Sequence, residues 1–337
     1  MSARRVVGLI RAGTCCLGAS LSGRAELGTA RLDFLRALLT AMRPHFFALP
    51  AGAALAGGAA CPAAPGWRIA TAAALSGLGW GVGQLVNDLL DREADRIDAP
   101  HRPAVRGVLP EGPTMLVAML LGVGIAFSIS LLHPGAVWLG LLSALLLLGY
   151  GPAKRTPLLG NVAHGALMAM AALIGGASAA PTSSLSVVVA RTAPTAAVVA
   201  GWAMVYLEAN YEKDRRGDGM AGYRTLPRLV GLRASAALRG AAAIALGLVA
   251  YRHGLLPGLV APGMMALGVL LVIVSSSLVL GAGTEQAALR GYRASVHAAA
   301  LGMLALGSAA VGDLAMLGVA SLNGLVVERA FRLSPNP

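Results

Sequence analysis

The chain has 337 residues, of which 56% are hydrophobic and only 12% are charged, and its net charge is +12. With a mean hydropathy of +0.71, it has too few polar side chains to cover a soluble globule, which indicates a multi-spanning membrane protein. The positive charge does not indicate a nucleic-acid binder, because Lys and Arg lie between long apolar runs. The three cysteines lack metal-ligand spacing, so neither a zinc site nor a disulfide framework is expected.

Along the chain, the first 30 residues carry four arginines and one acid around a short apolar run. We expect a dispensable extension or a targeting segment there, followed by a membrane domain over 31–325 and a C-terminal tail over 326–337. Nine apolar stretches predict an all-α bundle of about nine transmembrane helices. They cover 37–60, 68–90, 114–132, 136–151, 158–180, 186–210, 232–252, 256–281 and 294–321.

The basic residues are distributed unequally between the two ends of these stretches. If successive stretches alternate in direction, 22 of the 27 Lys and Arg residues share a side with the N-terminus. The positive-inside rule puts that side in the cytoplasm. An odd number of helices then puts Arg329 and Arg332, near the C-terminus, on the opposite side.

Two acidic motifs with matching spacing follow the second and sixth stretches. In each, one Asn and two Asp lie four residues apart, which places them on one face of a helix, and the first motif has an additional Asp. The residues are Asn87, Asp88, Asp91 and Asp95 in the first motif and Asn210, Asp214 and Asp218 in the second. Each motif precedes an Arg and a Leu-Pro pair, so we expect two related four-helix units in one orientation, with a ninth helix added.

The chemistry of these motifs points to a metal ion. Several carboxylates that converge at a membrane surface repel one another unless a cation neutralises them. With only oxygen ligands available, magnesium is the expected ion, and it commonly shares its coordination shell between carboxylates and a substrate phosphate. The expected catalytic residues are Asp91, Asp95, Asp214 and Asp218, and the expected metal ligands are these four and Asp88.

Basic residues on the same side would hold the remaining charge of a diphosphate. Arg102 lies beside the first motif, Arg224 beside the second, and Lys154 and Arg155 follow the fourth stretch. For Lys154 and Arg155, anchoring at the membrane surface is an equally good interpretation. Metal and cations together would stabilise diphosphate as a leaving group while an isoprenoid tail runs between the helices.

These motifs resemble the UbiA superfamily of intramembrane prenyltransferases, and the resemblance covers roughly residues 31–321. Further matches are Arg43-Pro44, Tyr150, Lys154-Arg155, Asn161 and the segment 222–227. The resemblance implies a helical bundle around a central cavity capped by the Asp-rich loops, a magnesium ion and a polyprenyl diphosphate donor. Together with the repeat and the charges, it gives the expected substrate-binding residues: Asn87, Arg102, Tyr150, Lys154, Asn161, Asn210 and Arg224.

The sequence alone leaves three functions open. The leading hypothesis is transfer of a prenyl group to an aromatic or lipid acceptor. The alternative is a membrane terpene cyclase that uses the same ionisation, and the third interpretation is an ion-coupled transporter. His164 and Glu208 are further candidates for contact with an acceptor. Polar residues at such positions are also commonly satisfied by a neighbouring helix.

Overall fold

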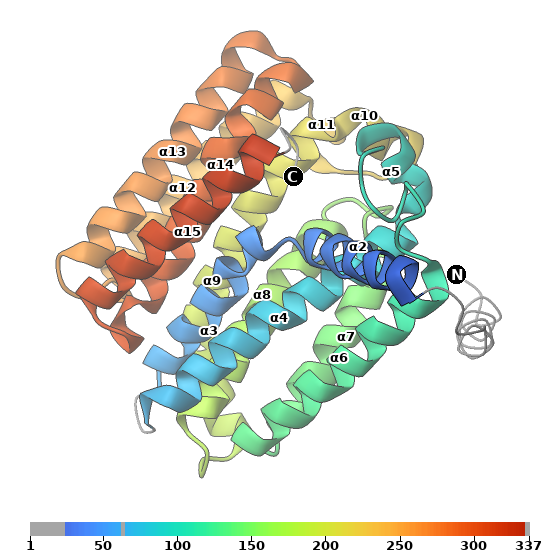
Figure 1. Ribbon diagram of the computed structural model, residues 1–337. Coiled ribbons are helices and arrows are strands. Elements are labelled where there is room, and N and C mark those ends of the chain that lie inside the picture. Colours follow the sequence, from blue (N-terminus) through green and yellow to red (C-terminus); the bar gives the residue numbers. More distant parts are fainter. Residues whose placement is uncertain (1–23, 62–64, 334–337) are drawn as a thin grey trace.

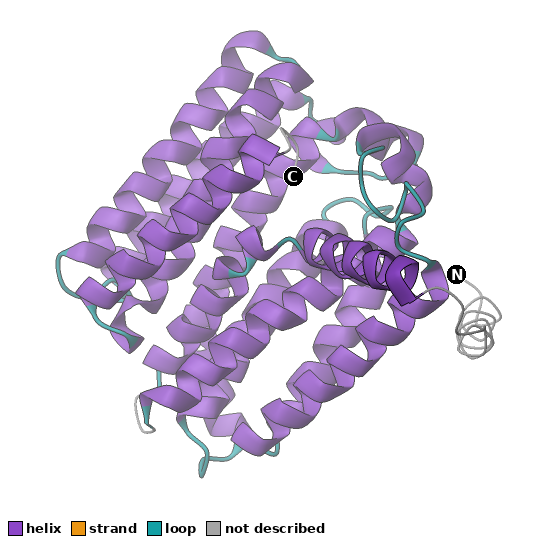
Figure 2. Ribbon diagram, viewed as in Figure 1, coloured by secondary structure: helices purple, strands orange, loops and turns teal. Residues whose placement is uncertain are grey.

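The computed structural model describes residues 24–61 and 65–333, and the regular structure in this part of the chain is entirely helical (Figure 2). The α-helices are α2 (Arg24–Met42), α3 (Ala48–Ala59), α4 (Gly66–Leu90), α5 (Arg92–Asp98), α6 (Glu111–Leu132), α7 (Ala136–Ala153), α8 (Leu159–Ala179), α9 (Leu185–Lys213), α10 (Arg215–Met220), α11 (Leu226–Leu229), α12 (Leu232–Arg252), α13 (Val260–Ala282), α14 (Glu285–Gly307) and α15 (Asp313–Leu333). Two short 3-10 helices, η2 (Pro44–Phe46) and η3 (Ser308–Ala310), complete the described elements.

Seven helices of the described chain are long and apolar enough to cross a membrane: α4, α6, α7, α8, α9, α12 and α13. The apolar windows of α6 and α7 are only 17% buried within the protein. Exposed side chains such as Leu120, Phe127 and Leu145 cover their outer faces, as expected for helices that face lipid. This confirms the expected all-helical membrane fold, although the seven helices leave the count of nine a prediction.

Nine helices of the described segments pack as a ring in which each contacts the next. The order is α3, α4, α6, α7, α8, α9, α12, α13 and α14, and α14 returns to α3. In Figure 1, α12 to α15 form one side of the molecule and α4, α6 and α7 the other, with α3, α8 and α9 between them. The helices α3 and α8 also contact each other, as do α9 and α14. These contacts cross the middle of the ring.

The contact between α3 and α8 depends on glycine. A Cβ atom on Gly57 would lie 1.8 Å from the carbonyl oxygen of Ala172, and one on Gly175 would lie 1.8 Å from that of Ala54. Small residues let helix backbones approach closely where apolar burial cannot drive association in lipid. The two glycines therefore set the separation of the helices at the centre of the bundle.

The first apolar stretch is not one helix. We expected a single helix over 37–60, but α2 ends at Met42 and α3 begins at Ala48, with η2 between them. Pro44 has no N–H for a helical hydrogen bond, and Arg43 before it adopts a left-handed conformation with φ of 51°. In Figure 1, α2 lies across the end of the bundle rather than along it.

The last stretch is also divided. We expected one helix over 294–321, but α14 ends at Gly307 and α15 begins at Asp313, after a turn in which Gly312 has φ of +86°. A Cβ atom on Gly258 would lie 2.7 Å from Asp313 Oδ2, while Glu328 Oε1 lies 2.8 Å from His297 Nε2 on α14. The helix α15 is therefore antiparallel to α14.

The C-terminal helix consequently ends where we did not expect it. In Figure 1, α15 (Asp313–Leu333) ends on the side of the bundle that carries α10 and α11. Arg329 and Arg332, expected on the opposite side, therefore lie at the same end as the acidic motifs. The helix also passes through the first part of the segment 326–337, where a tail was expected. The expected extension over 1–30 lies mostly outside the described residues.

Candidate functional site

Both acidic motifs fold in the same way. The helices α4 and α9 end one residue before Asp91 and Asp214, whose backbone conformations are nearly equal, with φ, ψ of −92°, 8° and −99°, 13°. In each case the amide of this Asp donates to the carbonyl of the Asn four residues earlier, at 2.8 Å from Asn87 and 3.0 Å from Asn210. The short helices α5 and α10 then follow and contact each other. This local match supports the expected internal repeat.

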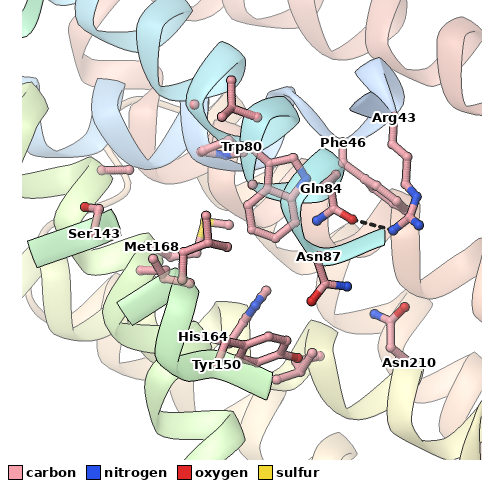
Figure 3. Close-up of a pocket in the computed structure, with 18 of the residues that line it drawn as sticks. Arg43, Phe46, Trp80, Gln84, Asn87, Ser143, Tyr150, His164, Met168 and Asn210 are labelled. Atoms are coloured by element: carbon pink, nitrogen blue, oxygen red, sulfur yellow. Dashed lines mark hydrogen bonds between the residues drawn. The ribbon is translucent and has the colours of Figure 1, made fainter. Parts of the chain in front are cut away.

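The two motifs lie at the mouth of a cavity of about 340 Å³. Polar residues of both motifs and their basic neighbours line the mouth, whereas the deeper walls come from apolar and small residues of α4, α6, α7 and α8. Figure 3 shows Trp80, Tyr150, His164 and Met168 around this cavity, together with Asn87 and Asn210 of the two motifs. The cavity therefore has a charged end and a hydrocarbon-like interior.

Asp91 joins three segments of the chain at the mouth. Its Oδ2 lies 2.7 Å from Lys154 Nζ, and its Oδ1 accepts a hydrogen bond of 3.0 Å from the hydroxyl of Tyr223. Lys154 Nζ also lies over the rings of Tyr223 and Tyr150, at 4.3 and 5.0 Å from their centroids. The amide of Arg224 donates to the carbonyl of Lys154 at 2.7 Å. The loops after α7 and α10 are thus fixed against the first motif.

The other two carboxylates of the first motif share arginines. Asp88 Oδ1 lies 2.6 Å from Arg43 Nη2 and 3.5 Å from Arg102 Nη1, and Asp95 forms an ion pair with the same Arg102 nitrogen. Asp88 Oδ2 is buried and has no hydrogen-bond partner in the described structure. Arg43 also bonds Gln84. This cluster is almost closed to solvent.

The second motif faces the same space from α9 and α10. Both carboxylate oxygens of Asp214 lie 2.7 Å from Nζ of Lys213, which also sits 4.7 Å from the centroid of the Tyr292 ring. Asp218 is buried, and its backbone oxygen accepts a hydrogen bond of 2.8 Å from the amide of Tyr223. Each motif therefore forms one side of the cavity mouth, and the two motifs come from different halves of the chain.

The protonation of the site reflects this crowding. Burial raises the pKa of Asp95 to about 6, although the charge of Arg102 opposes the shift. Burial alone would lower the pKa of Lys154, but the facing carboxylate of Asp91 outweighs it and raises that pKa. Burial also raises the pKa of Tyr223 to about 12, so its hydroxyl stays protonated and can donate to Asp91 at neutral pH.

Nine of the expected site residues line the cavity: Asn87, Asp91, Asp95, Arg102, Tyr150, Lys154, Asn210, Asp214 and Asp218. Asp88, Asn161 and Arg224 do not line it. Asp88 lies behind the lining with its arginines, and Arg224 is exposed, as is Arg155. Asn161 instead donates to Glu208 Oε2 at 3.0 Å in a buried network.

Glu208 belongs to that network rather than to the cavity. Its Oε1 accepts a hydrogen bond of 2.7 Å from Ser235, which also reaches Glu212. Arg239 binds both oxygens of Glu212, at 3.2 and 2.9 Å. The network ties α8, α9 and α12 together below the second motif.

Four residues that we did not single out from the sequence also belong to the mouth: Gln84, Tyr211, Lys213 and Tyr223. The hydroxyl of Tyr211 lies 3.2 Å from that of Tyr150. Their positions in the sequence could have indicated them, because Tyr211 and Lys213 fall within the second motif and Tyr223 precedes Arg224. Which of them reaches the mouth depends on the turn after each helix.

The residues present suit a divalent cation bound together with an anion. No three His, Cys, Asp or Glu side chains of the described segments form a cage on their own, because the carboxylates face Lys or Arg. The buried Oδ2 atom of Asp88 has no hydrogen-bond partner in the described structure, so this oxygen is left for a cation. All of the donors are oxygens, as magnesium prefers.

Comparison with known proteins follows the same lines. The model of the UbiA prenyltransferase family matches residues 46–296. The chain is 32% identical over 177 residues to digeranylgeranylglyceryl phosphate synthase of Methanospirillum hungatei JF-1, covering 51% of this chain and 61% of the relative. It is 31% identical over 207 residues to the enzyme of that name from Thermococcus gammatolerans, covering 60% and 72%. The chain therefore spans about three fifths of the length of the relative from Methanospirillum hungatei JF-1.

Solved structures share the fold. A UbiA homologue from Aeropyrum pernix K1 superposes with a TM-score of 0.64 at 22% identity, over 79% of this chain and 96% of that one. A UbiA homologue from Archaeoglobus fulgidus, bound to DMAPP and Mg²⁺, gives a TM-score of 0.56 at 12% identity, over 89% and 98%. With the family model matched over most of its membrane helices, the chain belongs to the UbiA prenyltransferase family.

Proposed function

We propose that the protein transfers a prenyl group from a prenyl diphosphate to the hydroxyl group of a glycerol-type lipid, with magnesium bound at the two acidic motifs. One observation carries this proposal: the paired charges of Asp91 and Lys154 stand at the mouth of a cavity whose interior is apolar. A diphosphate ester of an isoprenoid has the same division into a charged head and a hydrocarbon tail.

The ion pairs of the free protein become useful when such a substrate enters. Lys154 and Arg102 would turn from Asp91 and Asp95 to the diphosphate oxygens, and the carboxylates would be left to hold cations. Magnesium would neutralise part of the charge that grows on the diphosphate. Tyr223 would keep Asp91 in place during this exchange, because its hydrogen bond uses the other carboxylate oxygen.

The reaction then needs a leaving group and a dry environment. The bond between C1 of the prenyl group and the diphosphate oxygen breaks, and its electron pair leaves with the diphosphate. An allylic cation is left at C1. Apolar walls exclude water, which would otherwise react with this cation. The acceptor oxygen, rather than water, forms a bond to C1, so the identity of the acceptor determines the product.

Support for a lipid acceptor comes from the relatives and the cavity. The two relatives named above are digeranylgeranylglyceryl phosphate synthases, whose name denotes a glycerol phosphate with two prenyl groups. The deep walls contain few polar side chains and come in part from helices that face lipid, so they suit a second hydrocarbon chain. We place the mouth in the cytoplasm on the basis of the positive-inside rule.

The test uses full-length protein in detergent with magnesium, radiolabelled geranyl, farnesyl and geranylgeranyl diphosphates, and either geranylgeranylglyceryl phosphate or a panel of aromatic acceptors. A lipid ether formed only with the glycerol acceptor would support the proposal. An aromatic product would replace the acceptor class, and a hydrocarbon or terpene alcohol formed without acceptor would support a cyclase. No consumption of diphosphate would reopen the transporter interpretation.

A further inference from the structure

One buried polar side chain in the cavity, that of His164, has no role in the reaction described so far. His164 lies on α8, is only 5% exposed, and lines the cavity. Its Nε2 atom is buried and has no hydrogen-bond partner in the described part of the chain. Because buried polar atoms are nearly always paired, an unpaired ring nitrogen in a substrate cavity indicates a partner that arrives with the substrate.

His164 lies one aromatic ring deeper than the charged mouth. Lys154 Nζ is 5.0 Å from the centroid of the Tyr150 ring, and the Tyr150 and His164 ring centroids are 6.2 Å apart. The α8 helix begins at Leu159, so His164 lies about one and a half turns below the loop that carries Lys154. With its diphosphate at Lys154 and its tail in the cavity, a donor would bring its first carbon atoms to this level.

The surroundings of His164 are almost entirely uncharged. Between ring centroids, His164 lies 5.5 Å from Trp80 and 6.4 Å from Tyr206. Figure 3 shows the side chains of Trp80 and His164 in the cavity. A neutral imidazole has one ring nitrogen that donates a hydrogen bond and one that can accept a proton. On the facing helix α4, Trp80 Nε1 and Ser76 Oγ are also buried without partners in the described structure.

These three groups complement a glycerol-like ligand. Trp80 Nε1 can only donate, so it needs an oxygen from the ligand, whereas Nε2 of His164 can accept the proton of a hydroxyl group. Ser76, one helical turn from Trp80 on the same face of α4, can do either. An alcohol that carries a second oxygen nearby would satisfy the set, and a hydrocarbon tail alone would satisfy none of it.

We propose that His164 is the general base of the transfer and that it binds the acceptor hydroxyl. This rests on the proposed function. As the C1–oxygen bond of the donor breaks and its electron pair leaves with the diphosphate, the acceptor oxygen forms a bond to C1. The proton of that hydroxyl passes to Nε2 of His164 and is released to solvent after the product leaves, so that the neutral imidazole is restored.

The experiment separates the proton from the ionisation. His164→Phe keeps an aromatic ring in the cluster, and His164→Ala leaves room for added imidazole. His253→Phe is the matched control, since His253 is exposed in the turn between α12 and α13 and does not line the cavity. Three quantities are measured: magnesium-dependent binding of the prenyl diphosphate, its slow hydrolysis without acceptor, and formation of the lipid ether.

We expect His164→Phe to retain donor binding and acceptor-free hydrolysis while ether formation falls by about 10²–10⁴, the usual contribution of a general base. Added imidazole should partly restore ether formation in His164→Ala but not in His164→Phe, and His253→Phe should behave as the wild type. Ether formation at the wild-type rate in His164→Phe would overturn the proposal, as would an equal loss of donor binding and hydrolysis. If the wild type binds donor but makes no ether with any alcohol, the proposed function fails together with this one.

Discussion

The hydroxyl of Tyr223 donates a hydrogen bond of 3.0 Å to Oδ1 of Asp91, 132 residues earlier in the chain. The loop after the second motif therefore positions a carboxylate of the first. Since α4 and α9 belong to different halves of the bundle, this contact links the two halves at the mouth of the cavity.

Removal of this hydroxyl should weaken the site without unfolding it. A hydrogen bond to a charged group contributes about 1.5–3 kcal/mol, so Tyr223→Phe should lower kcat/KM for the donor by about tenfold or more. The steady-state rate of diphosphate release measures this. Tyr251→Phe, at an exposed position on α12, should leave kcat/KM unchanged. Equal rates for Tyr223→Phe and the wild type would show that Lys154 alone positions Asp91.

Loss of either motif should stop the reaction. Asp91→Asn and Asp214→Asn keep the size of the side chain but remove a charge that would hold magnesium, so diphosphate release should fall by about 10² or more in each. Addition of EDTA to the wild type should have the same effect, and excess magnesium should reverse it. Asp33→Asn, on the exposed face of α2, is the control. Normal turnover in both variants would exclude a metal at the motifs.

The buried pair of Arg239 and Glu212 should matter for stability. Both side chains are 1% exposed, and removal of one partner from a buried ion pair costs about 3–5 kcal/mol because the other charge stays uncompensated. Arg239→Met should therefore lower the Tm in detergent strongly, and adding Glu212→Met should restore part of the loss. Arg36→Met, in an exposed pair with Asp33, should change stability by less than about 1 kcal/mol. A second substitution that lowers the Tm further would contradict the ion-pair interpretation.

The crossing of α3 and α8 should not tolerate a methyl group. Gly175→Ala would put a carbon atom 1.8 Å from the carbonyl oxygen of Ala54, so the helices must separate and the Tm should fall. On α6, a Cβ atom on Gly124 would meet no atom within 4 Å, so Gly124→Ala should be neutral or slightly stabilising. Thermal unfolding followed by circular dichroism compares the two. Similar Tm values would mean that the crossing is looser than described.

The path of α15 predicts which side of the membrane its end faces. In a variant without native cysteines, Arg332→Cys and Arg228→Cys should react with a membrane-impermeant thiol reagent from the same side. His253→Cys, in the turn between α12 and α13, should react from the other side. Reaction of Arg332→Cys together with His253→Cys would mean that α15 does not return across the membrane.

Much of the site could be predicted from the sequence because the motifs are local. Asp91 and Asp95, or Asp214 and Asp218, are four residues apart, so helical geometry alone places them near each other. Their joint position at one cavity mouth also follows from alternating helices. The arginines were harder to place, since Arg102 reaches Asp95 through a loop whose course is not periodic.

The errors in the fold have a common physical cause. Hydropathy reports apolar length but not breaks, so the stretches over 37–60 and 294–321 read as continuous helices. Pro44 and Gly312 interrupt them, and the second break lets α15 return and reverse the expected position of Arg329 and Arg332. Asn161 and Arg224 failed to reach the cavity because their orientation depends on packing, which spacing does not report.

The walls of the cavity on α6 and α7 include Gly122, Ala126, Gly140, Ser143 and Ala144. These small residues lie on the two candidate membrane spans that are least buried within the protein, and Arg102 and Lys154, which we propose bind the diphosphate, lie outside the bounds of both helices. Larger side chains there would shorten the room for hydrocarbon while the chemistry at the mouth and the core of the bundle stay as they are. The length of the prenyl chain can therefore diverge among descendants of this protein through single substitutions, independently of the reaction itself.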